Sequence, residues 1–410
     1  MTLLKNKDFL LLWLTSLVST FCLSISWVSE SWYAINVLQR EKEYGYILVC
    51  AMLPRLLFMF VGGVIADNFS RKHTISTSLA IRAALLGVLG ALMAAGQAGF
   101  GILMLFAFLY GILDAYYWPS RDAILIDVVP ADDLPRANSW MLVTAQAGMI
   151  LGPAAGGMLA ATLSFPAIFF LLSAALAVAI LLFWCLFRAA VPAPGDPETG
   201  GRRRWQPERF KAELLEGLRY VRGHAQLSVL MLVFAVANVL YMGPFQQSIP
   251  LLASRQLGGS ATAFGNLWAA FGVGMCAGGI LMSIVAPARA RFRLVLYTLC
   301  VQSLLLSSLA FIHDLGTGIA VMGLIGLCVA LHNVPTTGML QTYTARDKLG
   351  RVMGFNDTIT MGMVPLSYLL VSGLLVLGIA YQAIVIVAGL AMFGFCLYAL
   401  GRYPVIRTTD

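Results

Sequence analysis

Residues 62–72 read Gly-Gly-Val-Ile-Ala-Asp-Asn-Phe-Ser-Arg-Lys and separate two long apolar segments. The segments on either side, 45–66 and 74–95, each have the length that an α-helix needs to cross the hydrocarbon core of a bilayer. The short connection between them holds one acid and two bases. Charges this close to a membrane core are costly unless they have a partner or face water. We therefore expect this connection to be a charged turn between two spans, with a function of its own.

The composition of the whole chain is that of a membrane protein. Of its 410 residues, 60% are hydrophobic and only 11% are charged, and the mean hydropathy is +0.84. Soluble domains carry roughly 25% charged residues, so this chain lacks the polar surface of a water-soluble globule. The apolar runs have the length of spanning helices, and short alternating segments typical of a β-barrel do not dominate. We expect an all-α polytopic fold with twelve spans, near residues 9–37, 45–66, 74–95, 101–127, 137–161, 167–188, 226–251, 262–286, 294–311, 318–343, 352–377 and 382–401.

The basic residues are unevenly distributed between the two sides of this layout. With a cytoplasmic N-terminus, and with Arg188 at the inner end of the sixth span counted as cytoplasmic, 21 of the 27 Lys and Arg residues lie in cytoplasmic segments, three in external loops and three in spans. This bias predicts that both termini are cytoplasmic. The net charge of +8 follows from the topology, and we expect no nucleic-acid partner.

One long polar interruption, residues 189–225, divides the spans six and six. It opens with a Pro-rich linker and continues with an amphipathic stretch, Pro207–Arg222, which we expect to lie as a helix along the inner membrane surface. The predicted domains are an N-terminal bundle (1–188), this linker with its amphipathic helix (189–225), and a C-terminal bundle (226–410).

The two halves repeat each other. Gly62-Gly63 matches Gly278-Gly279, and Pro119 matches Pro335, both at an offset of 216 residues. Duplicated six-span halves around a midplane cavity are typical of secondary transporters. Ionisable residues of the N-terminal half lack counterparts in the other: Glu30 aligns with Gln246, Asp67 with Ser283, Asp114 with Ala330 and Arg121 with Thr337.

The charged residues within the spans are candidates for proton coupling, because ionisable groups at membrane depth normally face a partner or a cavity. Arg55 and Asp114 stand near the middle of the second and fourth spans and form the leading pair. Asp114 would exchange a proton while Arg55 favours its ionised form; alternatively, the pair is static and fixes helix packing. Arg82 has no evident partner in the sequence, and snorkelling towards the membrane surface would explain it.

Glu30 lies in the outer third of the first span. Three interpretations stay open: a second proton carrier, a contact for a cationic group of a substrate, or a carboxylate hydrated at the external mouth. At the inner end of the fourth span, Arg121, Asp122 and Asp127 crowd together and indicate cytoplasmic gating.

Aromatic and amide side chains at the depth of a midplane cavity are candidate substrate contacts, because they offer stacking surfaces and adaptable hydrogen bonds. Packing and interface anchoring are the alternatives for each of them. The candidates are Trp27, Tyr33, Tyr117, Trp118, Asn238, Tyr241, Gln246, Trp268, His332, Asn333 and Asn356. A metal role for the lone His332 is not expected.

Residues 148–157 read Gly-Met-Ile-Leu-Gly-Pro-Ala-Ala-Gly-Gly. Gly148, Gly152 and Gly156 are four residues apart and form a smooth ridge that permits close helix approach. Pro153 removes a backbone hydrogen bond and bends the helix. We expect this ridge to make a tight contact between the two halves; ordinary small-residue packing is the alternative.

At these two stretches the sequence resembles the major facilitator superfamily. Its loop pattern is Gly-x-x-x-Asp-Arg-x-Gly-Arg-Lys/Arg; here Gly63, Asp67, Arg71 and Lys72 match, whereas Asn68 and Ser70 depart from it. The pattern Gly-x-x-x-Gly-Pro-x-x-Gly-Gly of the antiporters is met at Gly148, Gly152, Pro153, Gly156 and Gly157. The resemblance implies a twelve-span fold in two six-helix bundles. It also implies that Asp67 docks near residues 350–354 and closes the cytoplasmic side.

Further features are similar to the branch of macrolide and siderophore exporters, among them Pro54-Arg55, Trp118-Pro119 and residues 216–221. This resemblance implies proton-driven export of an amphipathic organic solute, either a drug or a siderophore-like metabolite, by alternating access. We expect a monomeric transporter of a bacterial inner membrane that needs membrane lipids and protons but no cofactor or metal, and that is not an enzyme. The alternatives are a lipid or lysolipid flippase of the same fold and a non-transporting membrane sensor.

Overall fold

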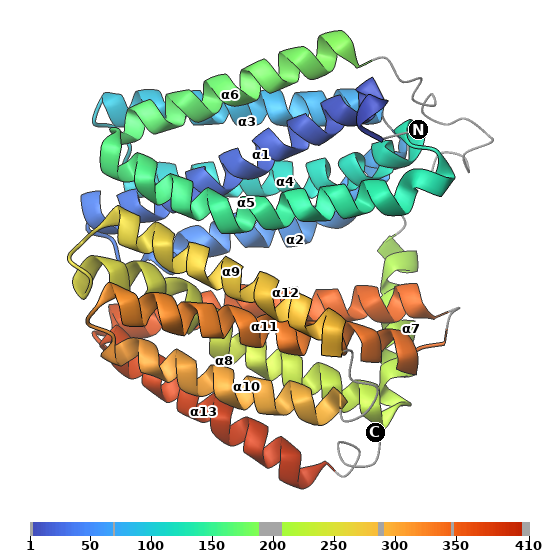
Figure 1. Cartoon of the computed structure of the whole chain (residues 1–410), viewed down its shortest axis with the longest axis vertical. Helices are drawn as coiled ribbons and strands as arrows, with labels where there is room; N and C mark the ends of the chain where they lie inside the picture. The colour runs from blue at the N-terminus through green and yellow to red at the C-terminus, as the bar shows by residue number, and fades with distance from the viewer. Residues whose placement is uncertain (1–2, 69, 188–206, 286–290, 346–347, 404–410) are drawn as a thin grey trace. The chain divides into compact units, whose positions relative to one another are not determined.

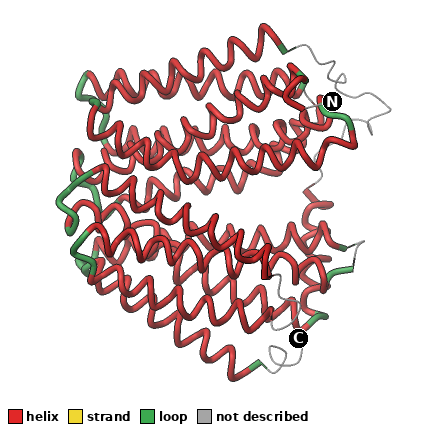
Figure 2. The backbone as a smooth tube through the Cα atoms, in the orientation of Figure 1, coloured by secondary structure: helices red, strands yellow, loops and turns green. Residues whose placement is uncertain are grey.

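The computed structural model describes residues 3–68, 70–187, 207–285, 291–345 and 348–403. All regular secondary structure in these residues is helical (Figures 1 and 2), so the predicted all-α fold is confirmed. The long helices are α1 (Lys7–Trp32), α2 (Tyr44–Asn68), α3 (Arg71–Ala94), α4 (Phe100–Val128), α5 (Leu134–Thr162), α6 (Phe165–Leu186), α7 (Pro207–Arg222), α8 (Ala225–Arg255), α9 (Ala261–Val285), α10 (Arg291–Ser308), α11 (Leu315–Tyr343), α12 (Leu349–Val376) and α13 (Tyr381–Arg402).

Each predicted span coincides with one of these helices. Eleven helices of the described residues are long and apolar enough to cross a membrane. The twelfth, α2, contains the shorter apolar segment Tyr44–Phe58 among its described side chains. A π-helical turn, Tyr33–Val37, continues α1 to the end of the first predicted span. The remaining helix, α7, separates the first six spans from the last six.

The chain divides into two compact units. Unit 1 consists of Met1–Arg40 and Ile47–Trp205, and unit 2 consists of Glu41–Tyr46 and Gln206–Asp410. Within unit 1, α1 packs against α5 and α6, and α3 packs against α4 and α6. Within unit 2, α11 packs against α9 and α10, while α8 packs against α12 and α13.

The crossing of α9 and α11 in unit 2 depends on glycine. A Cβ atom on Gly274 would overlap the carbonyl oxygen of Gly323, and one on Gly326 would overlap that of Phe271. The two backbones therefore touch with no side chain between them, which is how small residues allow membrane helices to approach closely.

The amphipathic helix α7 is present as predicted, and its described end packs against the start of α12. Glu216 accepts a hydrogen bond from Lys348 at 2.6 Å and another from Arg351. Gly217 lies against the backbone carbonyl of Arg351 and the side chain of Phe355. This part of α7 is thus held by unit 2 itself, in addition to any contact with a membrane surface.

Docking of α7 on α12 should weaken in acid. The hydrogen bond from Lys348, assisted by the charge of Arg351, holds the pKa of Glu216 below its ordinary value of 4.5. Because the folded-state pKa is lowered, the contact stabilises docking at neutral pH and is lost as the pH falls through that lowered value. A spin label at the exposed Leu215 should therefore become more mobile as the pH falls through that lowered pKa. In the Glu216→Gln variant the label should be mobile at every pH. If the variant and the wild type show the same pH response, Glu216 is not the group that controls docking.

Candidate functional site

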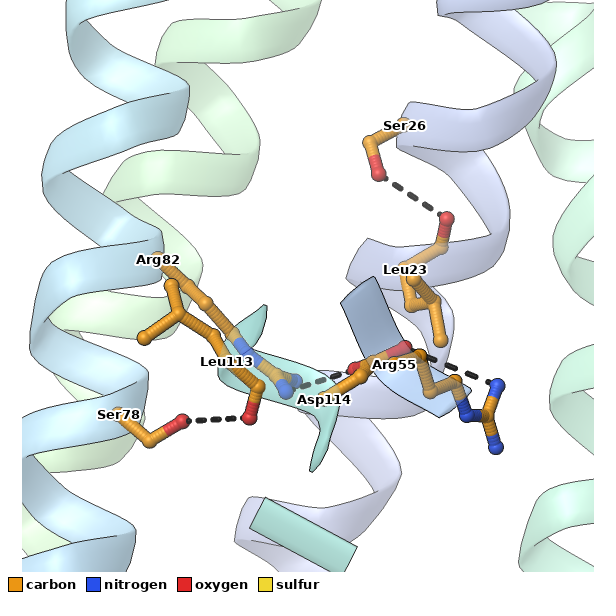
Figure 3. Close-up of polar contacts among 7 residues, drawn as sticks. All are labelled: Leu23, Ser26, Arg55, Ser78, Arg82, Leu113 and Asp114. Carbon is orange, nitrogen blue, oxygen red and sulfur yellow. Dashed lines mark hydrogen bonds and ion pairs between the residues drawn. The ribbon is translucent and has the colours of Figure 1, made fainter. Parts of the chain in front are cut away.

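Three charged side chains meet near the middle of their helices in unit 1 (Figure 3). Asp114 of α4 accepts a hydrogen bond from Nη2 of Arg82, which lies on α3, at 2.7 Å. Its other carboxylate oxygen lies 3.8 Å from Nη1 of Arg55, which lies on α2. One carboxylate therefore stands between two guanidinium groups. We call these three residues the charge cluster.

Arg82 is the closer partner of Asp114, and the expectation that it snorkels to the membrane surface is wrong. Its side chain is 1% exposed, and that of Asp114 is 8% exposed. The guanidinium carbon lies 5.0 Å from the ring centre of Tyr110 and 4.8 Å from that of Tyr117. A buried cation is stabilised by an ion pair and by aromatic faces, so Arg82 has both kinds of partner at the centre of unit 1.

Arg55 occupies a different environment from Arg82. The distance of 3.8 Å to Asp114 is longer than a hydrogen bond, and the Arg55 side chain is 44% exposed. The predicted Arg55–Asp114 pair is present as the longer of two contacts to this carboxylate, and Arg55 is the more exposed of its two partners.

Glu30 lies near the end of α1 and is buried, with 6% of the residue exposed. Its oxygen Oε1 has no hydrogen-bond partner among the described residues. This burial does not fit a carboxylate hydrated at an external mouth. A proton carrier and a cation contact both remain compatible with a buried carboxyl group that has a free oxygen.

The basic residues of the loop motif bind within unit 1. Nη1 of Arg71 donates to both carboxylate oxygens of Asp127, at 2.8 and 2.7 Å, and to the carbonyl oxygen of Ala123 at 3.2 Å. Nζ of Lys72 donates to the carbonyl oxygen of Phe187 at 2.8 Å, at the end of α6. These contacts fasten the start of α3 to the ends of α4 and α6.

The remaining gate candidates differ in how much of them is described. Arg121 donates to Asp122 at 2.9 and 2.5 Å, and its guanidinium carbon lies 4.4 Å from the ring centre of Trp118. Gly63 and Asp67 lie in the last turns of α2, where the structure describes the backbone helix but not the surroundings of the residues. The predicted docking of Asp67 therefore stays a prediction.

The glycine ridge of α5 faces α1, which belongs to the same unit. Cβ atoms built on Gly148, Gly152 and Gly156 would meet Thr20, Ser24 and Val28 of α1, respectively. The expectation that these glycines contact the other half is wrong, and the alternative of close packing holds. Helical spacing predicts a smooth face but not which neighbour fills it. Pro153 and Gly157 are buried in the same helix.

The candidate substrate contacts of unit 1 are mostly engaged with neighbouring side chains. Tyr33 makes an edge contact with Phe165, and Tyr117 lies under Arg82. Trp118 makes an edge contact with Tyr117, at 5.7 Å between ring centres. Trp27 is half-buried. Tyr117 is thus the one of these aromatic residues that joins the charge cluster.

The candidates of unit 2 gather partly in an aromatic cluster. Tyr241 stacks on Phe245, and Trp268 makes edge contacts with Phe245 and Phe271. The His332 ring lies 5.8 Å from that of Phe234. The other candidates lie outside this cluster. Asn238 donates to the carbonyl oxygen of Phe234, and Asn356 donates to Asp357. Gln246 is half-buried, with Oε1 unpartnered among the described residues, and Asn333 is exposed.

A buried polar network in unit 2 was missed by sequence reasoning. Gln247 donates to the carbonyl oxygen of Tyr368 at 3.0 Å and accepts from the Ser372 hydroxyl at 3.0 Å. Gly45 lies against both Gln247 and Ser372. The signal was the polar run Gln246-Gln247-Ser248 within an apolar span, because a buried amide needs hydrogen-bond partners.

Comparison with known proteins supports a transporter fold. A model of the Major Facilitator Superfamily matches residues 12–368. The multidrug efflux pump Tap of Mycobacterium tuberculosis is 28% identical over 99% of this chain and 95% of the pump. Macrolide efflux protein A of Streptococcus pyogenes is 22% identical over 84% of this chain and 82% of that protein. The staphyloferrin A transporter of Staphylococcus aureus is 24% identical over 77% and 73%, respectively.

Solved structures share the fold at lower sequence identity. A bacterial homologue of the human lysosomal transporter Spinster has a TM-score of 0.70 at 15% identity, over 98% of this chain and 96% of that one. A POT family transporter has a TM-score of 0.73 at 10% identity, over 98% and 97%. At this level of identity the likeness concerns the architecture alone.

Proposed function

This chain belongs to the Major Facilitator Superfamily, and we propose that it exports an amphipathic organic solute in exchange for protons by alternating access. The proposed location is a bacterial inner membrane, with both termini in the cytoplasm. The names of its relatives, which include a multidrug pump, a macrolide efflux protein and a siderophore transporter, support export of a drug-like or siderophore-like compound. The proposed protein is a monomer.

The observation that carries the proton coupling is the buried carboxyl group of Glu30. An unpaired charge in such a site is costly, so Glu30 is stable there as the neutral acid and loses its proton when water or a cationic group reaches it. No described residue holds its oxygen Oε1 by a hydrogen bond, which favours that exchange. Glu30 is therefore the proposed proton carrier.

Asp114 has a different role in this proposal. It is the counter-ion of Arg82 at 2.7 Å and stands 3.8 Å from Arg55, so its protonation would leave two guanidinium groups without a balancing charge. We assign it to holding α2, α3 and α4 in register while Arg55 faces the water-filled path. A solute or a change of conformation that displaces Arg55 would then alter the contacts that join all three helices.

The cytoplasmic contacts support alternating access as the mode of transport. Arg71 and Lys72 fix the ends of α3, α4 and α6 to one another, which favours movement of unit 1 as one body. Rigid-body movement of repeated bundles is the usual mode of such transporters. In this proposal Gly63 and Asp67, with Arg121 and Asp122, take part in closing the cytoplasmic side.

Export should stop when the proton gradient is collapsed. In everted vesicles that contain the protein, uptake of a macrolide or another solute found by screening should require a gradient that is acidic inside, and an uncoupler should abolish it. Glu30→Gln should lower gradient-driven uptake at least about tenfold, consistent with loss of an essential proton-transfer group. Asp132→Asn, which changes an exposed acid in the short turn before α5, should transport as the wild type does. Unchanged uptake after addition of the uncoupler would refute proton coupling.

A further inference from the structure

A cavity of about 260 Å³ opens at the end of unit 2 that is remote from the linker. It lies between the segment that precedes α2, the last turns of α8 and α12, and the first residue of α13. All of its lining residues belong to unit 2. We call it the Arg255 cavity. None of the proposed transport residues lines it.

The charged side-chain groups of this cavity that are not engaged with a described residue are hydrogen-bond donors. Glu41 is engaged by Arg255, whose Nε donates to Oε2 at 3.0 Å and whose Nη2 donates to Oε1. This leaves the Nη1 group of Arg255 and the ammonium group of the exposed Lys42. The two cations and one carboxylate give the cavity a net positive charge. Its chemistry therefore favours an anion with several acceptor oxygens.

Tyr381 is a second, independent indication of a ligand. The residue is 3% exposed, and its hydroxyl group has no hydrogen-bond partner among the described residues. Buried polar groups in folded proteins are rarely left without a partner, because their desolvation is then uncompensated. An acceptor oxygen in the cavity beside Tyr381 would satisfy this hydroxyl group.

The rest of the lining is apolar and reaches the protein surface. Leu251 and Leu375 are buried, whereas Ile379 is 40% exposed. The neighbouring Leu377, in the turn between α12 and α13, is 80% exposed. Ile379 and Leu377 both lie beside the end of a helix long and apolar enough to span a membrane, where the acyl chains of a bilayer are within reach. The ligand therefore has hydrocarbon next to its anionic group.

We propose that the Arg255 cavity binds the phosphate of an anionic membrane lipid. The planar guanidinium group of Arg255 and the ammonium group of Lys42 contact the phosphate oxygens, and the Tyr381 hydroxyl donates to one of them. The first carbons of the acyl chains lie along Ile379 and Leu377. The site is separate from the proposed transport path, so this proposal does not depend on whether the protein exports the solute proposed above.

The test is lipid binding to the purified full-length protein in detergent, followed by native mass spectrometry and by thermal denaturation. Dioleoyl phosphatidylglycerol, which carries a net negative charge, should bind more tightly than dioleoyl phosphatidylcholine. The choline group of the latter is a cation, and the one carboxylate of the cavity, Glu41, is already paired with Arg255. The double variant Lys42→Gln/Tyr381→Phe should weaken phosphatidylglycerol binding at least tenfold. Arg402→Gln, which removes an exposed cation from the far end of α13, should bind as the wild type does.

The same experiment separates a lipid from a soluble source of the anion. Glycerol 3-phosphate alone should bind much more weakly than the lipid; equal binding would retain the anion site and assign it to a soluble phosphate. Tyr381→Phe alone removes one hydroxyl group without changing the charge. It should also weaken phosphatidylglycerol binding, by less than the double variant does, and so it tests the site even if the double variant folds poorly. Equal binding of the two lipids, or binding unaffected by both variants, would overturn the proposal.

Discussion

Asp114→Asn should destabilise the protein more than Arg82→Gln, although the two residues form one ion pair. The asparagine leaves Arg82, 1% exposed, without a counter-ion. Arg82→Gln leaves Asp114 with Arg55 still 3.8 Å away. Removing one partner of a buried pair costs about 3–5 kcal/mol because the other charge is left uncompensated. The measurement is the thermal-denaturation midpoint of the purified protein, together with its yield from the membrane.

The double variant Arg82→Gln/Asp114→Asn separates charge from packing. It leaves no unpaired charge between α3 and α4, so it should recover much of the stability lost in Asp114→Asn, as a double-mutant cycle would show. The surface pair of the exposed Arg136 and the half-buried Asp133, 3.8 Å apart, is the matched control. Its loss should change the free energy of unfolding by about 1 kcal/mol or less. If the stability losses of the two single variants simply add in the double variant, Arg82 and Asp114 do not stabilise each other as a buried ion pair.

Among the glycines of unit 1 whose surroundings the structure describes, Gly111 should be the one least tolerant of substitution by alanine. A Cβ atom at this position of α4 would overlap the backbone carbonyl of Ala51 on α2. Backbone atoms cannot rotate away, so the helices must separate, and overpacking of this kind costs about 1–3 kcal/mol or more. Because α2 carries Arg55, the same shift should also enlarge its distance to Asp114 and lower transport in proportion.

Gly101→Ala is the control for that prediction on the same helix. Among the described residues, no atom beyond its chain neighbours and its own helix backbone lies within 4 Å of a Cβ atom built on Gly101. Alanine favours helix over glycine by roughly 1 kcal/mol. Gly101→Ala should therefore be neutral or slightly stabilising. Similar thermal-denaturation midpoints for the two variants would contradict the close α2–α4 crossing.

The fold could be predicted from the sequence because a bilayer restricts backbone geometry so strongly. Spanning segments must satisfy their own hydrogen bonds, so the apolar runs alone located α1 to α6 and α8 to α13. The breaker-rich linker and the spacing of Phe210, Leu214, Leu218 and Val221 located α7. These signals are local, and each depends on a continuous stretch of chain.

The partners of the charged and small residues could not be predicted in the same way. A helical pattern gives the depth of Arg82 but not the direction of its side chain, and so its bond to Asp114 was missed. The signal was present: α3 and α4 are joined by a short turn, and both residues lie at similar distances from it. The ridge at Gly148–Gly156 was placed against the wrong partner for the same reason, since a smooth face does not identify its neighbour.

The central claim is that Glu30 carries the proton exchanged for solute. The most direct measurement is proton movement in proteoliposomes that contain a pH-sensitive dye, started by addition of a transported solute with no imposed gradient. The wild-type protein should move protons against the direction of the solute, and Glu30→Gln should bind the solute without moving protons. Equal proton movement by both proteins, or solute transport by the wild type with no proton movement, would contradict this account.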